Sequence, residues 1–474
     1  MMAEGLFRGV FMSKPRPSVQ LLLTSIFVFL LFAFPALADS KARVVRVSDV
    51  QGSVEIDRNN GRGYEKAFMN LPITEGMKIR TADDGRAELQ FEDNSTLRLV
   101  PDSQIEVPKL SLRDSGAKVS TIHLLEGMVY VNFQGTKGDE FTLTFARESI
   151  ALTQPAHLRI GLGDADAAVA VFGGEVQVTG PGGTVNLAKN QTGRFDLVED
   201  SYKLAKHVEG DPFDAWDKQQ NQYQQRYADA SYSSYSPYAY GSSDLNYYGS
   251  WYDLPGYGQM WQPYFAGAGW DPFMNGSWTM FPGFGYGWVS AYPWGWLPYN
   301  YGAWNYVPLY GWMWQPGGAW MGGYPLPVFA GLPPGYAAPR PPIFPGPRVI
   351  HVNGGAGSKV TQGLFTRIEI PNNSAGLGIP RGSINNLPHV AGLAETHASV
   401  SSGLHLPEVM STPGFYRSGF GAPRGSAWGA HGYSSRTRSS SWGSRGFGSS
   451  GSMSSAHSVG GGGHVGGGAV GGHH

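Results

Sequence analysis

The chain has 474 residues, a formal net charge of −1 at pH 7 and no cysteine. Its length allows two or three domains, but 68 Gly, 33 Pro and only 15% charged residues predict that parts of it form no ordinary core. The near-zero charge argues against nucleic acid as a partner. The lack of cysteine excludes disulfides, thiolate zinc sites and thiol nucleophiles.

Residues 1–38 predict a secretory signal peptide. Basic residues precede the apolar run from Leu21 to Phe34, and Ala36 and Ala38 follow it in the A-x-A pattern of a cleavage site. The run is shorter than the roughly 20 apolar residues that span a bilayer, which favours cleavage over the alternative of a retained anchor helix. We therefore expect an exported protein, in the periplasm, on the outer surface or secreted, with no transmembrane segment after cleavage.

Residues 39–198 predict one all-β domain. Ala87, Leu89 and Phe91 alternate with polar residues such as Glu88, and this period of two is typical of a strand with one buried face. The same alternation recurs in "GMVYVNF" and "GGEVQVTG". The outward acidic side chains are expected to form a solvated face. Short, evenly spaced runs favour a β-solenoid, a roll or a sandwich, and periodicity does not choose among them.

A helical connector is predicted over residues 211–230. Asp211 can cap its N-terminus, and Pro212 suits the first helical position. Aromatic residues form a partial apolar stripe along the segment: Phe213, Trp216, Tyr223 and Tyr227. We expect this helix to pack against neighbouring elements.

Residues 245–325 predict an irregular β-module built from aromatic repeats. Eleven of the 14 Trp residues fall between Trp251 and Trp320, where the only charged residues are Asp253 and Asp271. The phrases "WDPFMNGSW" and "WLPYNYGAW" share one pattern and start 26 residues apart, which indicates a stacked or propeller-like array. The candidate interaction residues are Trp261, Trp270, Trp278, Trp288, Trp296, Trp304, Trp314 and Trp320.

Two interpretations of these indole rings remain open. Buried rings would serve as the core of a module that is poor in aliphatic residues, and aromatic stripes are more often core than binding site. Exposed rings would instead stack on sugar faces or on another aromatic-rich protein. The sequence favours the core and leaves the second interpretation as an alternative.

The rest of the chain changes composition twice. Residues 326–410 are Pro-rich and are expected to be extended, whereas residues 411–474 form a Gly/Ser/Arg/His tail that is expected to be disordered. The tail histidines lack the spacing of a metal site: His457, His464, His473 and His474. We predict no metal and no cofactor. The basic tail is expected to be solubilising, rather than to bind anionic lipid or polysaccharide.

Several phrases of the β-domain resemble the FecR domain. They are "VQGSVEI", "GRAELQF", "LLEGMVYV" and "AVFGGEVQV", and Asn94 stands where the family pattern usually has Gly. The resemblance covers about Arg43 to Asp196 and implies a periplasmic all-β domain. In signalling members, this domain relays the state of an outer-membrane transporter to a sigma factor. Those members carry a helical anti-sigma segment, whereas about 20 residues precede the apolar run here, so we expect no direct sigma-factor contact.

The Trp-rich part resembles an uncharacterised bacterial module that accompanies FecR-like domains. The phrases that carry this resemblance are "DLNYYGSW", "YGQMWQP" and "YGWMWQPGGAW". The usual "HYGRW" of that module reads "NYGAW" here, from Asn300 to Trp304, so its His and Arg are missing. The resemblance implies no chemistry.

The sequence predicts a non-enzymatic envelope protein that acts in protein or surface interaction and scaffolding. No P-loop, G-x-S-x-G or H-E-x-x-H motif occurs. A periplasmic signalling accessory of a FecR-type pathway and a glycan-binding protein remain as alternatives. The expected partner is an envelope protein or a surface glycan, and the sequence does not predict the oligomeric state.

We predict that the exported protein begins at Asp39. A signal peptidase that recognises Ala36 and Ala38 cleaves after the second alanine. N-terminal sequencing of the protein recovered from the periplasm or the medium measures this. An intact N-terminus in the membrane fraction would show that the apolar run is an anchor.

Overall fold

The computed structural model describes residues 43–228, 240–267, 269–281, 285–319, 329–337, 339–341, 367–368, 370, 373–396 and 404–405. All of them belong to one compact unit, Met1–Pro423. The predicted signal peptide, most of the Pro-rich segment, the Gly/Ser-rich tail and Trp320 lie outside the described residues. Within the described part of the chain, no helix is long and apolar enough to cross a membrane.

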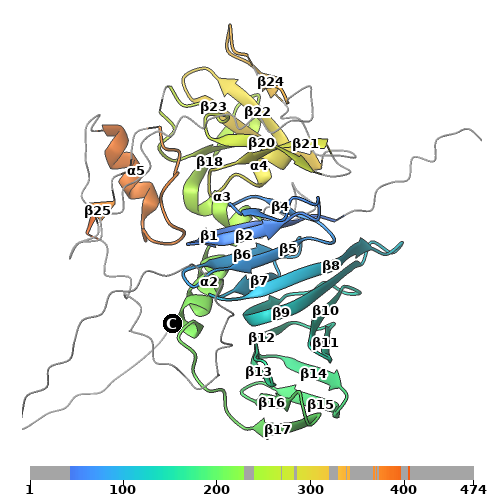
Figure 1. The fold of residues 1–474 in the computed structure, drawn as a ribbon. Helices are drawn as coiled ribbons and strands as arrows, with labels where there is room; N and C mark the ends of the chain where they lie inside the picture. Colours follow the sequence, from blue (N-terminus) through green and yellow to red (C-terminus); the bar gives the residue numbers. More distant parts are fainter. Residues whose placement is uncertain are drawn as a thin grey trace, which may run out of the picture. The chain divides into compact units, whose positions relative to one another are not determined.

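The chain is mainly β, as predicted, and its first 17 strands form the β-domain (Figure 1). Their bounds are β1 Val45–Gln51, β2 Val54–Asp57, β3 Tyr64–Lys66, β4 Pro72–Ile73, β5 Lys78–Thr81, β6 Arg86–Gln90, β7 Thr96–Leu99, β8 Gln104–Leu112, β9 Lys118–Phe133, β10 Glu140–Phe145, β11 Glu148–Leu152, β12 Ala156–Leu162, β13 Asp166–Gly173, β14 Glu175–Gly180, β15 Gly183–Ala188, β16 Thr192–Asp196 and β17 Ser201–Ala205.

These strands form a roll of two facing sheets. Sheet 1 has the order β4-β1-β6-β7-β9-β12-β13-β16-β17, and sheet 2 has the order β3-β2-β5-β8-β9-β10-β11-β14-β15. The chain passes repeatedly between the sheets while it advances along both. Leu89 and Leu97 of sheet 1 share one core with Ile79 and Ile105 of sheet 2, and all four are fully buried. Of the three arrangements that the sequence left open, a β-solenoid, a roll and a sandwich, the structure is a roll.

Strand β9 joins the two sheets, and Gly127 marks the crossing. The half Lys118–Glu126 pairs within sheet 2, whereas the half Gly127–Phe133 pairs within sheet 1. Gly127 has φ +80°, and a Cβ atom there would overlap the carbonyl oxygen of Asp102. Only glycine combines this left-handed backbone with such a close approach.

Helix α2, Asp214–Tyr227, follows the roll. The predicted start at Asp211 and Pro212 is wrong by a few residues, because Phe213 is the N-cap and Asp211 instead accepts a bond from the Phe213 N–H in a preceding turn. Trp216 and Tyr223 are buried, in agreement with the expected packing.

The aromatic module contains three β-hairpins and two short helices. Their bounds are α3 Ser242–Tyr248, β18 Gly249–Leu254, β19 Gly258–Pro263, β20 Gly276–Phe281, β21 Gly285–Ser290, α4 Leu297–Asn300, β22 Tyr301–Val307 and β23 Gly311–Ala319. Beyond it lie β24 Phe329–Gly331, β25 Arg367–Ile368, α5 Leu387–Thr396 and β26 Leu404–His405. The prediction of one helix missed α3, α4 and α5. The first two are too short to show an apolar period.

We predict that Gly127→Ala lowers the free energy of unfolding by about 2–4 kcal/mol, because the new methyl group meets backbone at a positive φ. The control is Gly161→Ala in β12, where a Cβ atom meets nothing within 4 Å. This control should change stability by less than about 0.5 kcal/mol. Urea titration monitored by circular dichroism measures both. Equal stabilities of the two variants would contradict the role of the crossing.

Candidate functional site

The hairpins β18–β19 and β22–β23 form a five-stranded sheet with β24, in the order β18-β19-β23-β22-β24, and a row of indole rings crosses it. In the hairpins β18–β19 and β22–β23, Trp251 pairs with Trp261, and Trp304 pairs with Trp314. Trp261 also pairs with Trp314 across the boundary between the two hairpins, so four Trp residues lie side by side on four adjacent strands. The hairpin β20–β21 has the same kind of cross-strand pair, Trp278 and Trp288, with ring centroids 5.5 Å apart.

Each Trp pair is accommodated by a glycine two residues before its first member. A Cβ atom at Gly249 would overlap the Trp261 ring, and one at Gly276 would lie 2.6 Å from the Trp288 ring. Gly302, at the corresponding place in the third hairpin, has φ +65° and lies close to Trp314. The repeating unit is therefore a hairpin with a Gly and two Trp. The phrase that starts at Trp270 and at Trp296 spans the junction between units.

Trp294 lies at the centre of the module and was missing from the predicted candidates. It is fully buried, and its ring centroid lies 4.8 Å from that of Trp261 and 6.1 Å from those of Trp270 and Trp304. Its indole N–H donates to the Ala375 carbonyl oxygen at 2.6 Å. Trp294 lies outside the repeated phrase and has no counterpart in the other copy, so a search for repeats could not find it.

The predicted interaction residues belong to the core of the module. The seven described rings are 8% exposed or less: Trp261, Trp270, Trp278, Trp288, Trp296, Trp304 and Trp314. The eighth candidate, Trp320, lies outside the described residues. The alternative in which these rings stack on a sugar is not supported for the seven, because their side chains are buried, whereas the favoured interpretation as core agrees with their burial.

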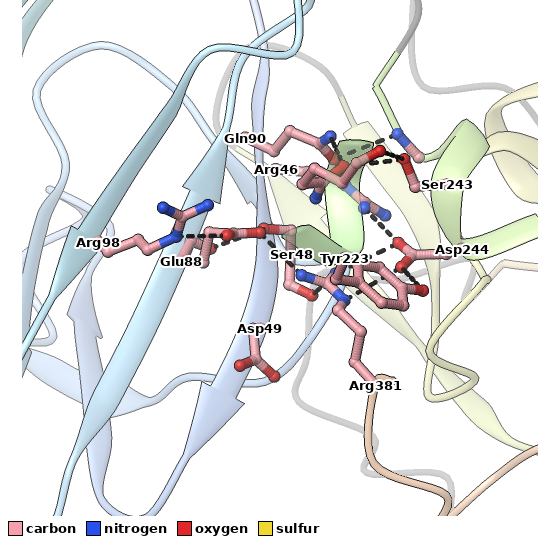
Figure 2. A network of polar contacts seen from close by, with 12 residues as sticks. Arg46, Ser48, Asp49, Glu88, Gln90, Arg98, Tyr223, Ser243, Asp244 and Arg381 are labelled. Carbon is pink, nitrogen blue, oxygen red and sulfur yellow. Dashed lines mark hydrogen bonds and ion pairs between the residues drawn. The ribbon is translucent and has the colours of Figure 1, made fainter. Parts of the chain in front are cut away.

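A buried ionic network lies on the outer face of sheet 1 (Figure 2). It contains three guanidinium groups and three carboxylates, which we call the ionic network: Arg46, Glu88, Arg98, Asp217, Asp244 and Arg381. These residues come from β1, β6, β7, α2, α3 and the segment that precedes α5. Their charges balance, which is the condition for keeping ionised groups away from water.

Asp244 of α3 receives donors from three directions. Arg46 forms an ion pair with it, and the Arg381 Nε lies 3.1 Å from its Oδ1 atom. The Tyr223 hydroxyl donates to the same Oδ1 at 2.9 Å. Because Arg46 lies in the roll and Asp244 in the module, this contact fastens the module to the outer face of sheet 1.

Glu88 of β6 continues the network toward α2. It accepts from Arg98 at 2.7 Å, from Arg381 at 2.8 Å and from the Ser48 hydroxyl at 2.6 Å. Arg98 also donates to Asp217 of α2 at 2.6 Å. Arg381 thus bridges Glu88 of the roll and Asp244 of the module.

The network shifts the pKa values of its members in the expected directions. Burial alone would raise the pKa of Glu88, but Arg98, Arg381 and the bond from Ser48 lower it to about 2. Burial would likewise lower the pKa of Arg381, and the carboxylates of Asp244 and Glu88 instead raise it well above its ordinary value. Asp49, beside the network, has a raised pKa chiefly because it is buried.

The expectation of a solvated outer face is wrong for this part of sheet 1. Glu88 points away from the core as predicted, and Arg46 and Arg98 lie on the same outer face, yet all three are 0% exposed. Two helices and the Arg381 segment cover them. Period-two alternation indicates which side chains point away from the core, but not whether another element covers them.

The network has the chemistry of a structural contact. Each carboxylate faces at least one guanidinium. Arg98 and Arg381 each pair with two carboxylates, and Arg46 pairs with Asp244 and also donates to the Gln90 side chain at 2.8 Å. No three His, Asp or Glu side chains of the described residues gather as a metal site.

Comparison with protein families assigns the two parts of the chain. Residues 77–177 match the FecR protein family, and residues 242–326 match a family of unknown function (DUF6600). The chain contains a FecR domain. Glu88 and Arg98 lie in the FecR match and Asp244 lies in the DUF6600 match, so the ionic network connects the two.

Among the solved structures similar to this chain are two crystal structures of a candidate anti-sigma factor from Parabacteroides distasonis ATCC 8503. They share 16% and 14% sequence identity with this chain, with TM-scores of 0.25 and 0.24. Each match covers 27% of this chain and 59% of the other. No curated protein matches.

We predict that Glu88→Gln lowers the free energy of unfolding by about 3–5 kcal/mol, because it leaves Arg98 and Arg381 buried without their shared carboxylate. The control is Glu55→Gln, which removes an exposed partner of Arg80 and should cost less than about 1 kcal/mol. Chemical denaturation measures both, and equal losses would contradict the assignment.

The same substitution should alter the response to acid. Because the pKa of Glu88 is about 2 in the folded protein and 4.5 ordinarily, its ionised form contributes stability above pH 4.5 that is lost as the pH falls toward 2. Stability of Glu88→Gln should therefore fall less steeply over this window than that of the natural protein. If the stabilities of the two proteins fell equally over this pH range, the ionisation of Glu88 would not contribute to stability.

Proposed function

We propose that the chain is an exported, non-enzymatic accessory of a FecR-type envelope signalling pathway that works by binding another protein. The observation that carries the proposal is the FecR domain itself, which the ionic network joins to the DUF6600 module. Signalling by contact needs a surface held in one arrangement, and a buried, balanced set of charges can fix the arrangement of two modules.

The interior chemistry supports binding rather than catalysis. The strongly shifted groups Glu88 and Arg381 point at each other inside the protein, not into a cleft. A catalytic acid or base has to reach a substrate, so shifted pKa values in a closed network favour a structural role. The seven described candidate Trp rings are buried, so they are not the surface that binds a partner. Their burial therefore argues against glycan binding through these rings.

Deletion of the gene in its native host tests the proposal. We expect transcript sequencing to show a changed set of genes under one extracytoplasmic sigma factor, because the accessory would support the relay to it. The full-length chain should restore the set, and so should the Glu55→Gln control. Glu88→Gln should restore less than half of the response, with immunoblots used to compare equal amounts of protein.

An unchanged transcript profile in the deletion strain would contradict the signalling role. If envelope composition then changed while transcription did not, the scaffolding interpretation would replace it. A hydrolytic or transfer activity that maps to the roll would contradict the non-enzymatic assignment.

A further inference from the structure

The two ends of the FecR roll differ in how they are covered. At the β1–β4 end, the Asn70 side chain donates to the carbonyl oxygens of Ser290 and Tyr292 at 3.1 and 2.7 Å. Val289 of the module packs into the roll core. The module therefore caps this end. Stacked β-structures need such caps because their last strand otherwise leaves apolar surface exposed.

The opposite end carries no equivalent cap within the described residues. Its last strands are β15 in sheet 2 and β17 in sheet 1, and each pairs with one described strand only, β14 and β16 respectively. Residues Ser201 to Leu204 of β17 are all exposed. Among the described residues, no strand pairs with the other edge of β17, so this row of backbone donors and acceptors can accept a further strand.

The apolar inner face of sheet 1 continues onto β17. Tyr202 pairs with the core residue Phe195, with ring centroids 6.3 Å apart, and Leu204 pairs with Gly193. Yet Tyr202 is 39% exposed and Leu204 is 52% exposed, and Val198 in the preceding turn is 75% exposed. Apolar side chains therefore continue on β17, where the structure no longer buries them. A further strand paired with β17 would cover them.

Charge selects the kind of strand that fits. Lys203 is exposed at the middle of β17, on the face opposite Tyr202 and Leu204. Its charge interacts with the carboxylate of Asp196 on the adjacent strand β16, but Lys203 forms no ion pair with any described residue. Its neighbour Arg194 on β16 is already paired with Glu209. An antiparallel second copy centred on Lys203 would place two lysines directly opposite each other, which destabilises a pair of strands. An acidic residue opposite Lys203 would instead stabilise the pairing of the two strands.

We propose that β17 is a docking edge for an extended segment of a partner protein in which apolar residues alternate with acidic ones. The apolar residues would cover Tyr202 and Leu204, the acidic ones would face Lys203, and backbone bonds would extend sheet 1. The inference rests on the proposed function as an interaction protein, and it assigns the surface and the chemistry of the partner.

A synthetic peptide of alternating Val and Glu is the probe, and the same peptide with Lys in place of Glu is its control. We expect the Val/Glu peptide to protect the backbone amides of β17 from hydrogen exchange in the full-length mature protein. Lys203→Glu should weaken its binding about tenfold and should reverse the preference toward the Lys peptide. Leu204→Asn should also weaken binding, whereas Thr184→Asn on the exposed strand β15 should not. All substituted positions are exposed, so folding should be retained.

Equal binding of the two peptides, or unchanged preference in Lys203→Glu, would overturn the proposal. So would protection of β17 that depends on protein concentration without peptide, because the occupant would then be a second copy. In the deletion strain, full restoration of the transcript response by Lys203→Glu would reject the docking edge and leave the signalling role intact. An absent response with the natural chain would reject the signalling role itself.

Discussion

The fold depends on charges that cannot remain buried unless they stay together. Glu88 and Asp244 are fully buried carboxylates, and the guanidinium groups around them, together with the hydroxyls of Ser48 and Tyr223, offset their loss of water. Arg381 also donates to the carbonyl oxygen of Ser48, 333 positions earlier in the sequence. Such partners are supplied only when the roll, α3 and the Arg381 segment are all in place. The network therefore makes the arrangement of the two modules specific, which hydrophobic burial alone does not require.

The aromatic module solves a different problem, that of building a core with few aliphatic residues. Each fully buried indole covers roughly 150–250 Å², worth several kcal/mol at roughly 25 cal/mol per Å². The glycine before each Trp pair lets the facing ring approach the backbone, as at Gly249 and Gly276. Trp294 fills the centre that the hairpins leave. The richness in Trp is thus explained by packing, and the surface that acts on a partner is to be sought elsewhere.

Local patterns in the sequence were enough to predict the β-domain and the alternation within its strands. They could not predict the ionic network, because an outward Glu88 or Arg98 looks the same whether water or a helix covers it. Asp244 stands in a Ser- and Tyr-rich stretch and Arg381 in a Pro-rich one, and neither has a local signal. The repeated phrases located the aromatic module. The hairpin unit was missed because the predicted candidates did not include Trp251, the partner of Trp261. Burial is a property of the tertiary structure, so the ionic network could be recognised only once the fold was known.

Hydrogen exchange under increasing denaturant, resolved by mass spectrometry, tests most directly whether the roll and the module form one unit. We expect the amides of β6, α3 and β19 to open with the same free energy, because loss of either module leaves unpaired charge in the other. The contradicting result would be a module that opens at clearly lower free energy while the exchange of β6 stays unchanged.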